Sequence, residues 1–120
     1  MLIRKLKYKN NLYKLGVYTY SNGRLHLALE NKNESYDITI DIPDMSMYDG
    51  NVLLDPAIME SGILSVIKKA RILNKVIGMF NYNYVDIPIA IVNMGQIRKY
   101  NCFGVTKHLD KVRKDVSFTE

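Results

Sequence analysis

The strongest conformational signal in the chain is the pair Asn22-Gly23, which separates two runs of alternating apolar and polar residues. A two-residue turn between antiparallel strands needs positive φ angles, which Asn and Gly adopt at low cost. In the run after the pair, one face carries only leucines and the other is mostly polar: Leu25, Leu27 and Leu29 against Arg24, His26, Ala28 and Glu30. The sequence therefore predicts a β-hairpin with a mirror-type turn and one buried face.

Three further runs extend this hairpin into a sheet. Residues 2–8 and 12–20 read as strands joined near Asn10-Asn11, with Tyr13, Leu15 and Val17 pointing inward. Residues 36–42 alternate isoleucine with polar side chains until Pro43, which cannot donate to a ladder. These runs predict a four-strand antiparallel meander with one apolar face.

The second half of the chain predicts helices to cover that face. Asp55-Pro56 is a typical helix start, and Gly62 should break or bend the following segment, which is expected to form a short helix and then a longer one, or one kinked helix. Residues 75–93 return to extended character, and Pro88 predicts that the second part is an edge strand or begins after a bulge. Asn93 and Thr106 are expected to cap two later helices, over 94–100 and 107–114.

The predicted fold class is α+β: an antiparallel sheet, a meander of about four strands plus one or two later strands, packed against one or two helices. With 120 residues the chain has the size of one domain, expected over residues 1–114, and residues 115–120 are expected to form a frayed tail. Its single cysteine, Cys102, excludes an internal disulfide and fits a reducing cytoplasm. The basic amino terminus lacks the apolar run of a signal peptide or membrane span, so a cytoplasmic location without a membrane partner is expected.

The net charge of +5 is unevenly distributed. Residues 1–29 carry six basic and no acidic groups, residues 30–60 eight acidic groups and one lysine, and residues 61–120 ten basic and four acidic groups. One interpretation is an acidic surface beside basic ones that steers a partner. The other is that the blocks neutralise one another across neighbouring strands.

The residues that could carry chemistry do not form a recognised catalytic or metal-binding pattern. The two histidines, His26 and His108, have no ligand spacing, and Cys102 has no base adjacent in sequence. Asp37 and Asp41 share a strand face but lie about 13 Å apart at the rise of a β-strand, too far to chelate one ion. We therefore expect a protein that is not an enzyme and that needs no cofactor or metal.

Two sets of residues are candidates for partner binding. The first follows the polar side of the predicted hairpin and its neighbour: Tyr18, Tyr20, Arg24, His26, Asp37 and Asp41. The second would neutralise phosphates in a nucleic-acid-binding alternative: Lys5, Lys7, Lys9, Lys68, Lys69 and Arg71. Against the second set, the tyrosines that would stack bases also suit strand packing, and the basic residues 4–9 could simply protect a sheet edge from aggregation.

Residues 20–43 also carry a family resemblance, through a tyrosine, an Asn-Gly-Arg-Leu turn, a leucine-rich strand and a strand that ends in an apolar-proline pair. The matching residues are Tyr20, Asn22, Gly23, Arg24, Leu25, Leu27, Leu29, Ile40, Ile42 and Pro43. In this order of elements the chain resembles an uncharacterised small-protein family of phages, plasmids and conjugative elements of Gram-positive bacteria. The resemblance implies an accessory protein of a mobile element, acting inside a bacterial host. Such proteins often inhibit a host defence protein or ribonucleoprotein, as anti-CRISPR proteins do, without a catalytic site.

Overall fold

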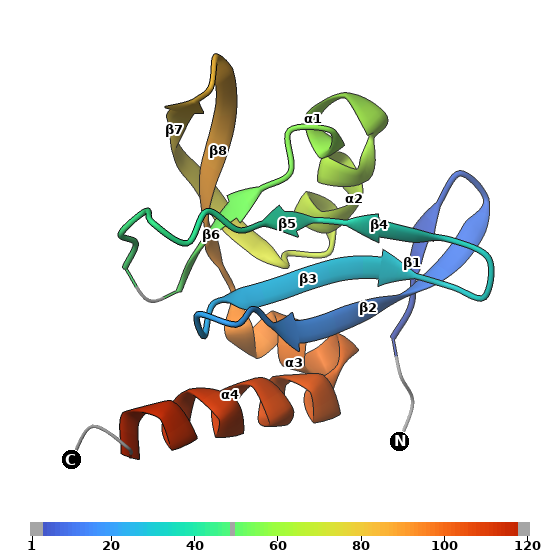
Figure 1. The fold of residues 1–120 in the computed structure, drawn as a ribbon. Coiled ribbons are helices and arrows are strands. Elements are labelled where there is room, and N and C mark those ends of the chain that lie inside the picture. The colour runs from blue at the N-terminus through green and yellow to red at the C-terminus, as the bar shows by residue number, and fades with distance from the viewer. Residues whose placement is uncertain (1–3, 49, 118–120) are drawn as a thin grey trace.

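Two four-stranded antiparallel sheets and four helices make up the computed structural model, which describes residues 4–48 and 50–117 (Figure 1). The first sheet is a meander in chain order: β1 (Leu6–Tyr8), β2 (Asn11–Thr19), β3 (Leu25–Glu30) and β4 (Ser35–Asp37). The second has the order β5-β6-β8-β7: β5 (Thr39–Ile40), β6 (Asn51–Leu54), β8 (Val85–Val92) and β7 (Leu73–Tyr82). The helices are α1 (Ile58–Ser61), α2 (Ile63–Lys69), α3 (Met94–Tyr100) and α4 (Cys102–Ser117). The α+β class and the four-strand meander are thus confirmed.

The first sheet is assembled on the face that the leucine pattern predicts. Leu25 is 7 % exposed, and Leu27 and Leu29 are completely buried. Tyr13, Leu15 and Val17 of β2 face the same core, as expected. The core continues into the second sheet and into the helices, so both sheets share one apolar interior.

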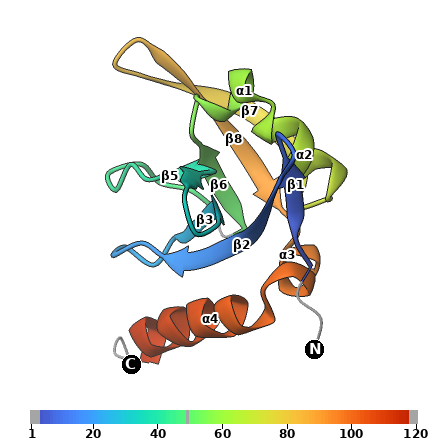
Figure 2. The same cartoon turned by 90° about the vertical axis from the view of Figure 1, so that its right-hand side faces the viewer.

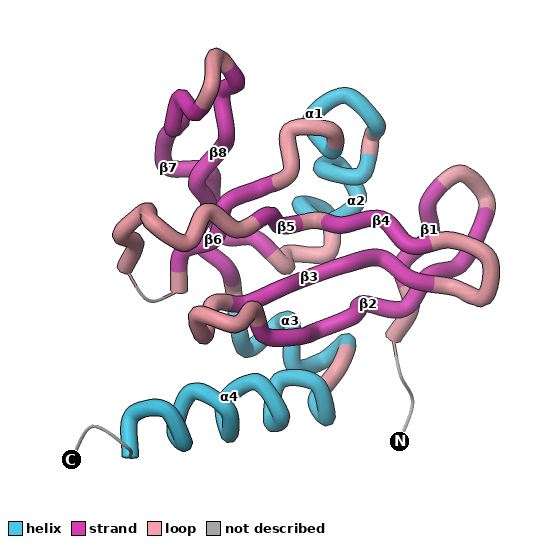
Figure 3. The backbone as a smooth tube through the Cα atoms, viewed as in Figure 1, coloured by secondary structure: helices cyan, strands magenta, loops and turns pink. Residues whose placement is uncertain are grey.

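The two sheets meet at Ile38, between β4 and β5. The Ile38 amide donates to the Leu27 carbonyl of the first sheet at 2.9 Å, and its carbonyl accepts from the Asp55 amide, just after β6, at 2.9 Å. Figure 3 shows β4 and β5 following one another along this extended run. The expected single strand over 36–42 is therefore divided between two sheets. Thr39, placed on the polar side by the alternation, is buried, and its Oγ1 accepts the Leu27 amide at 3.1 Å.

The turns differ from the prediction in type. Among the described turns, the mirror-type pattern of two successive positive φ angles falls at Lys9-Asn10 (49° and 64°) and Asn83-Tyr84 (50° and 67°), not at Asn22-Gly23. In the β2–β3 turn only Gly23 has a positive φ, of 90°, and its amide donates to the Tyr20 carbonyl at 2.9 Å. The expected mirror-type turn is therefore wrong. The loop has three residues, Ser21 to Gly23, and a loop of this length needs only one left-handed residue, a position that Gly23 occupies without strain.

The α1–α2 region is divided at Gly62 as predicted, but its start differs from the prediction: α1 begins at Ile58, with Ala57 at the N-cap position and no side-chain cap. The Asp55 carboxylate accepts the Ala57 amide at 3.0 Å ahead of α1, and Gly62, with a φ of 88°, ends α1 and starts α2. The Tyr8 hydroxyl donates to the Ser61 carbonyl at 2.7 Å, which fixes these helices beside β1. Figure 2 shows β1 running past α2.

The last two helices are only partly as predicted. Asn93 caps α3, since its side chain accepts the Gln96 amide at 3.1 Å. The Thr106 cap is wrong: α4 begins at Cys102, and Asn101 accepts the Gly104 amide at 2.8 Å. Asn101 also donates to the Leu15 carbonyl at 2.8 Å, so this one side chain starts α4 and anchors it to β2. The ribbons show α4 lying along β2 (Figures 1 and 2).

Pro88 lies in a central strand, because β8 pairs with both β6 and β7; the expected edge position is wrong. The pairing with β6 ends at Ile89, so at Pro88 only β7 flanks the strand. Hydrogen-bonded and non-hydrogen-bonded pairs alternate along the β7–β8 ladder from the Asn83-Tyr84 turn, so Met79 and Pro88 form a non-hydrogen-bonded pair. At such a pair the missing proline N–H costs no hydrogen bond between β7 and β8. The proline is thus accommodated where the second neighbour has ended.

Candidate partner-binding surface

Four of the predicted partner-binding residues lie together on the outer side of the first sheet. The Tyr20 and His26 rings stack with centroids 4.6 Å apart and an interplanar angle of 15°, and the Tyr18 ring lies 5.6 Å from that of His26. His26 Nε2 lies 3.1 Å from Asp37 Oδ1. Together with Glu30, which bonds Tyr18, these residues form a single connected cluster, hereafter the tyrosine–histidine face.

The Tyr18 hydroxyl donates to Glu30 Oε1 at 2.6 Å, and this bond to a carboxylate raises the pKa of Tyr18. Burial is the main cause of a raised pKa of Tyr20, whose hydroxyl lies 3.1 Å from the Thr39 carbonyl oxygen, to which it donates. Both hydroxyls therefore stay protonated at neutral pH. They hold the rings in fixed orientations on the sheet.

Gly16 makes room for this arrangement. It is paired with Ala28 beneath the Tyr18–Glu30 bond, and a Cβ at Gly16 would lie 2.8 Å from the Tyr18 ring and also too close to the Glu30 carboxylate. The two side chains thus lie flat over the backbone. They help to explain why Ala28 is 2 % exposed although the alternation assigned it to the outer side.

The remaining two predicted residues, Arg24 and Asp41, are occupied within the fold. Arg24 lies 3.2 Å from Asp41 Oδ1, donates to the Ile42 carbonyl at 2.7 Å and also donates to the Met45 carbonyl. Asn22 donates to the Asp41 carboxylate at 2.9 Å. The arginine and aspartate side chains are 21 % and 11 % exposed, so their main structural role is to fix the segment after β5 against the β2–β3 turn.

Replacing Arg24 by Ala is expected to lower the free energy of unfolding by about 1.5 kcal/mol, because partly buried acceptors lose a charged donor. The matched variant Lys32→Ala removes an exposed cation and is expected to stay within about 0.5 kcal/mol of wild type. Urea unfolding curves measure both. Equal stability of Arg24→Ala and wild type would contradict the anchoring role of this side chain.

The lysines of the nucleic-acid alternative do not converge on one patch. In β1, Leu6 and Tyr8 are buried toward the core and α1, so Lys7 extends from the opposite side of the strand. Lys68 and Lys69 form the end of α2, a helix that starts at Gly62 beside the Tyr8 ring, and Arg71 follows just after them. Lys9 belongs to the β1–β2 turn. The predicted set is thus divided between two sides of β1.

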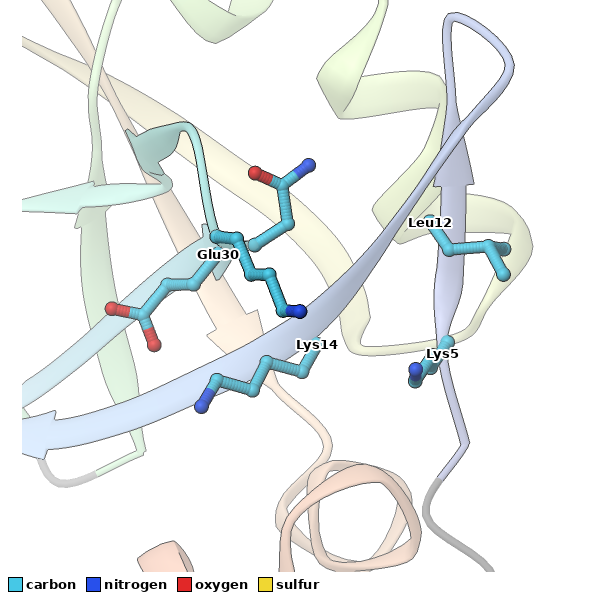
Figure 4. A pocket seen from close by; sticks show the side chains of 6 residues that line it. Lys5, Leu12, Lys14 and Glu30 are labelled. Carbon is cyan, nitrogen blue, oxygen red and sulfur yellow. The ribbon is translucent and has the colours of Figure 1, made fainter.

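A second basic cluster, which shares Lys5 with the predicted set, forms around a hollow of about 320 Å³ (Figure 4). The hollow is lined by Lys5, Leu12, Lys14, Glu30, Asn31 and Lys32. Lys14 pairs directly with Glu30 in the β2–β3 ladder. The Glu30 carboxylate, however, accepts the Tyr18 hydroxyl and extends away from Lys5 in Figure 4. Glu30 therefore joins the tyrosine–histidine face to this lysine hollow.

The second histidine has a structural position. His108 of α4 is 7 % exposed, and its Nδ1 lies 2.7 Å from Thr19 Oγ1. Burial, and after it the charge of Lys111, lowers the pKa of His108. His108 also lines a groove of about 600 Å³ between the β2–β3 turn and α4. The neutral ring thus helps to hold α4 on β2.

Because the pKa of His108 is lower in the folded than in the unfolded protein, the unfolded chain binds more protons just below pH 6.5. Stability is therefore expected to fall as the pH drops through about 6.5 toward the folded pKa. The His108→Gln variant should lose this part of the pH dependence, whereas His26→Gln should keep it. Melting temperatures between about pH 7.5 and pH 5.5 measure the difference; the same slope for His108→Gln and wild type would contradict it.

In the described part of the chain, no group of three or more His, Cys, Asp or Glu side chains is placed to hold a metal ion. Cys102 is half-buried at the start of α4. Two further aspartates, Asp44 and Asp49, follow Asp37 and Asp41 in the sequence, and Asp49 lies outside the described residues. Nor does any described helix combine the length and apolar character that a membrane span requires.

Comparison with known proteins adds no relative: no protein-family model, curated protein or solved structure matches this chain. The geometry of the candidate surface is therefore the basis for inferring what it does.

The β7–β8 hairpin forms a second exposed surface, which was not predicted from the sequence and which extends away from the rest of the fold (Figures 1 and 2). Its exposed apolar residues are Ile77, Met79, Tyr82, Tyr84 and Val85. The sequence signal that could have identified this surface is the absence of charge: residues 76–85 contain no charged side chain, although 24 % of the residues of the chain are charged. We call residues 76–87 the apolar arm.

Proposed function

We propose that this chain is a non-enzymatic binding protein that docks onto a protein partner through the tyrosine–histidine face. One observation carries the proposal: four side chains from neighbouring strands form one stacked and hydrogen-bonded cluster. They are Tyr18 of β2, Tyr20 just after β2, His26 of β3 and Asp37 of β4. Tyrosine is enriched in protein interfaces because its ring provides contact area and its hydroxyl a directional bond.

The cluster is ordered before any partner arrives. Tyr18 is 46 % exposed, yet its hydroxyl is fixed by Glu30, and the Tyr20 hydroxyl is fixed by Thr39. Binding to such a surface costs little side-chain entropy, since the rotamers are already selected. This favours a specific docking surface over a merely solvated strand.

The proposed partner is a host defence protein or ribonucleoprotein, which the protein inhibits in the manner of an anti-CRISPR protein. Two features support it: the family resemblance of residues 20–43, and the continuity of the tyrosine–histidine face with the lysine hollow. Aromatic residues would contact protein, while Lys5, Lys14 and Lys32 would contact phosphates of a bound RNA. A composite surface of this kind suits a complex that contains both components.

The test is capture from host lysate by the tagged full chain, combined with phage infection of a host that carries the defence system. We expect wild type to enrich a defence component and to restore infection, and the double variant Tyr18→Ala/His26→Ala to do neither while remaining folded. Tyr48→Ala is the matched control, because Tyr48 is 86 % exposed but lies outside the cluster. If wild type enriches no defence component and rescues no infection, the proposal fails.

Direct nucleic-acid binding is the second candidate, favoured by the three lysines at the hollow. Mobility shifts across a salt series would show a steep loss of affinity if phosphates are neutralised. Lys5→Glu/Lys14→Glu should then abolish binding, whereas the control Lys68→Glu/Lys69→Glu, on the other side of β1, should retain it. Equal loss in both pairs would point to nonspecific attraction.

A further inference from the structure

We propose that the apolar arm is a self-association surface, on which a second copy of this chain pairs antiparallel along β7. This inference is independent of the proposed function. It starts from the position of β7, which has β8 on one side and forms the edge of the second sheet. An open edge offers unpaired backbone groups to another strand.

The ladder determines which backbone groups are offered. Tyr82 and Val85 flank the two-residue turn Asn83-Tyr84 and therefore form a hydrogen-bonded pair. Because antiparallel pairs alternate, Met79 and Asn81 direct their N–H and C=O groups away from β8. The register is irregular only up to Gly78, so the stretch 78–82 is a regular edge.

A two-fold axis at Phe80 pairs every outward N–H and C=O group of Met79 and Asn81 with a group of the second copy. Met79 of each copy then lies opposite Asn81 of the other, and each of the two pairs exchanges two backbone hydrogen bonds. Phe80 faces its own symmetry mate at a non-hydrogen-bonded position, where side chains approach most closely. Within one copy Phe80 already stacks on Tyr82, with centroids 6.2 Å apart, so the dimer would extend an existing aromatic pair into a row.

The side chains and the charge favour a second copy over a charged partner. Met79 is 56 % exposed and Ile77 45 %, so both gain burial when the arms pair. The protein as a whole is +5, which favours anionic partners, but residues 76–85 carry no charge to attract one. Two copies of the uncharged stretch 76–82 can approach without placing like charges in the interface.

The tip of the arm gives an additional observation. Tyr84 is 99 % exposed and has a φ of 67°, a conformation that is unfavourable for a bulky side chain. The monomer offers this ring no packing that offsets the strain, which is the situation found at functional positions. In the proposed register each tip lies toward Val76 and Ile77 of the other copy, where the ring would be covered.

The experiment measures the mass of the full chain by sedimentation over a range of concentrations. We expect a weak monomer–dimer equilibrium, because the paired strands bury less than the ~1,600 Å² of a standard stable interface. Met79→Lys, which adds a charge to the edge, and Asn81→Pro, which removes an outward N–H without breaking the β7–β8 ladder, should both be monomeric. Leu12→Lys is the matched control: Leu12 is a 58 % exposed leucine on β2, and this variant should still dimerise.

Hydrogen exchange completes the test, since the Met79 and Asn81 amides should become protected as the concentration rises. A wild type that is monomeric at every concentration would overturn the proposal, as would dimers that persist in both arm variants or are lost in Leu12→Lys. Protection of these amides only after host lysate is added would assign the edge to a foreign strand, and also overturns it. If monomeric Met79→Lys still captures the partner, self-association through the apolar arm and partner binding through the tyrosine–histidine face are separate properties.

Discussion

Replacing Leu27 by Ala is expected to lower the free energy of unfolding by about 2–5 kcal/mol. Leu27 is completely buried, and its backbone groups bond to Ile38 and Thr39 where the two sheets meet. A truncated side chain would leave a cavity that the surrounding strands are too constrained to fill. Urea unfolding followed by circular dichroism measures the loss.

The control for this prediction is Leu12→Ala. Leu12 is 58 % exposed on β2, so the same truncation removes little buried area and should change stability by less than about 0.5 kcal/mol. Similar stability of the two variants would mean that the strand faces are assigned wrongly.

Gly104→Ala is expected to destabilise the protein by about 2–3 kcal/mol, although Ala normally favours a helix over Gly. A Cβ at Gly104 would lie 2.9 Å from Val17 Cβ and 2.9 Å from Asn101 Cγ. Neither atom can move freely, because Val17 is buried and the Asn101 side chain is bonded to both Leu15 and Gly104. The variant should therefore lift α4 from β2.

Gly95→Ala provides the opposite expectation with the same substitution. Gly95 lies in α3, and a Cβ added there would have its nearest neighbour, Asn93 Oδ1, at 3.5 Å, in contact range without overlap. Helix propensity should then stabilise the protein by up to about 1 kcal/mol. Thermal melts of the two variants should shift in opposite directions; a shift in the same direction would contradict the close approach at Gly104.

Period-two alternation was sufficient to predict the leucine face, because successive side chains of a strand point to opposite faces and every leucine of β3 points to the core. It could not predict the division of residues 36–42, because the alternation looks the same whichever sheet supplies the neighbour. Nor could it predict the role of Arg24. Parity indicates the side of the strand on which a residue lies, whereas a loop from elsewhere decides whether that side is covered.

Local signals for caps and turns succeeded where one residue type satisfied one requirement. Gly62 supplies a positive φ and Asn93 a side-chain acceptor, and both were predicted. Asn101 and Thr106 are both residue types suited to cap α4. The choice of Asn101 depends on its bond to the Leu15 carbonyl of β2, which a local sequence signal does not contain. The mirror-type turns at Lys9-Asn10 and Asn83-Tyr84 contain no glycine, so their sequence offers no comparable signal.

The tyrosine–histidine face was partly predictable for the same reasons. Alternation placed Tyr18 and His26 on the outer side. Their direct pairing was not predictable, because the predicted two-residue turn would place Tyr18 opposite Leu27, whereas the observed three-residue loop places it opposite His26. The bond from Tyr18 to Glu30 was not predictable, since it depends on the absence of a side chain at Gly16. The apolar arm was not predicted because tyrosines at alternating positions suit strand packing equally well.

Ile38 places its amide in one sheet and its carbonyl in the other. Neither sheet can open at this point without weakening its neighbour, so partial unfolding that releases only one of them should be rare. Amide protons of Leu27 and Asp55 should then exchange with solvent at free energies close to that of whole-molecule unfolding, and with the same denaturant dependence. The two sheets are therefore expected to behave as one cooperative unit, whose formation depends on contacts between residues far apart in the chain and is correspondingly slow.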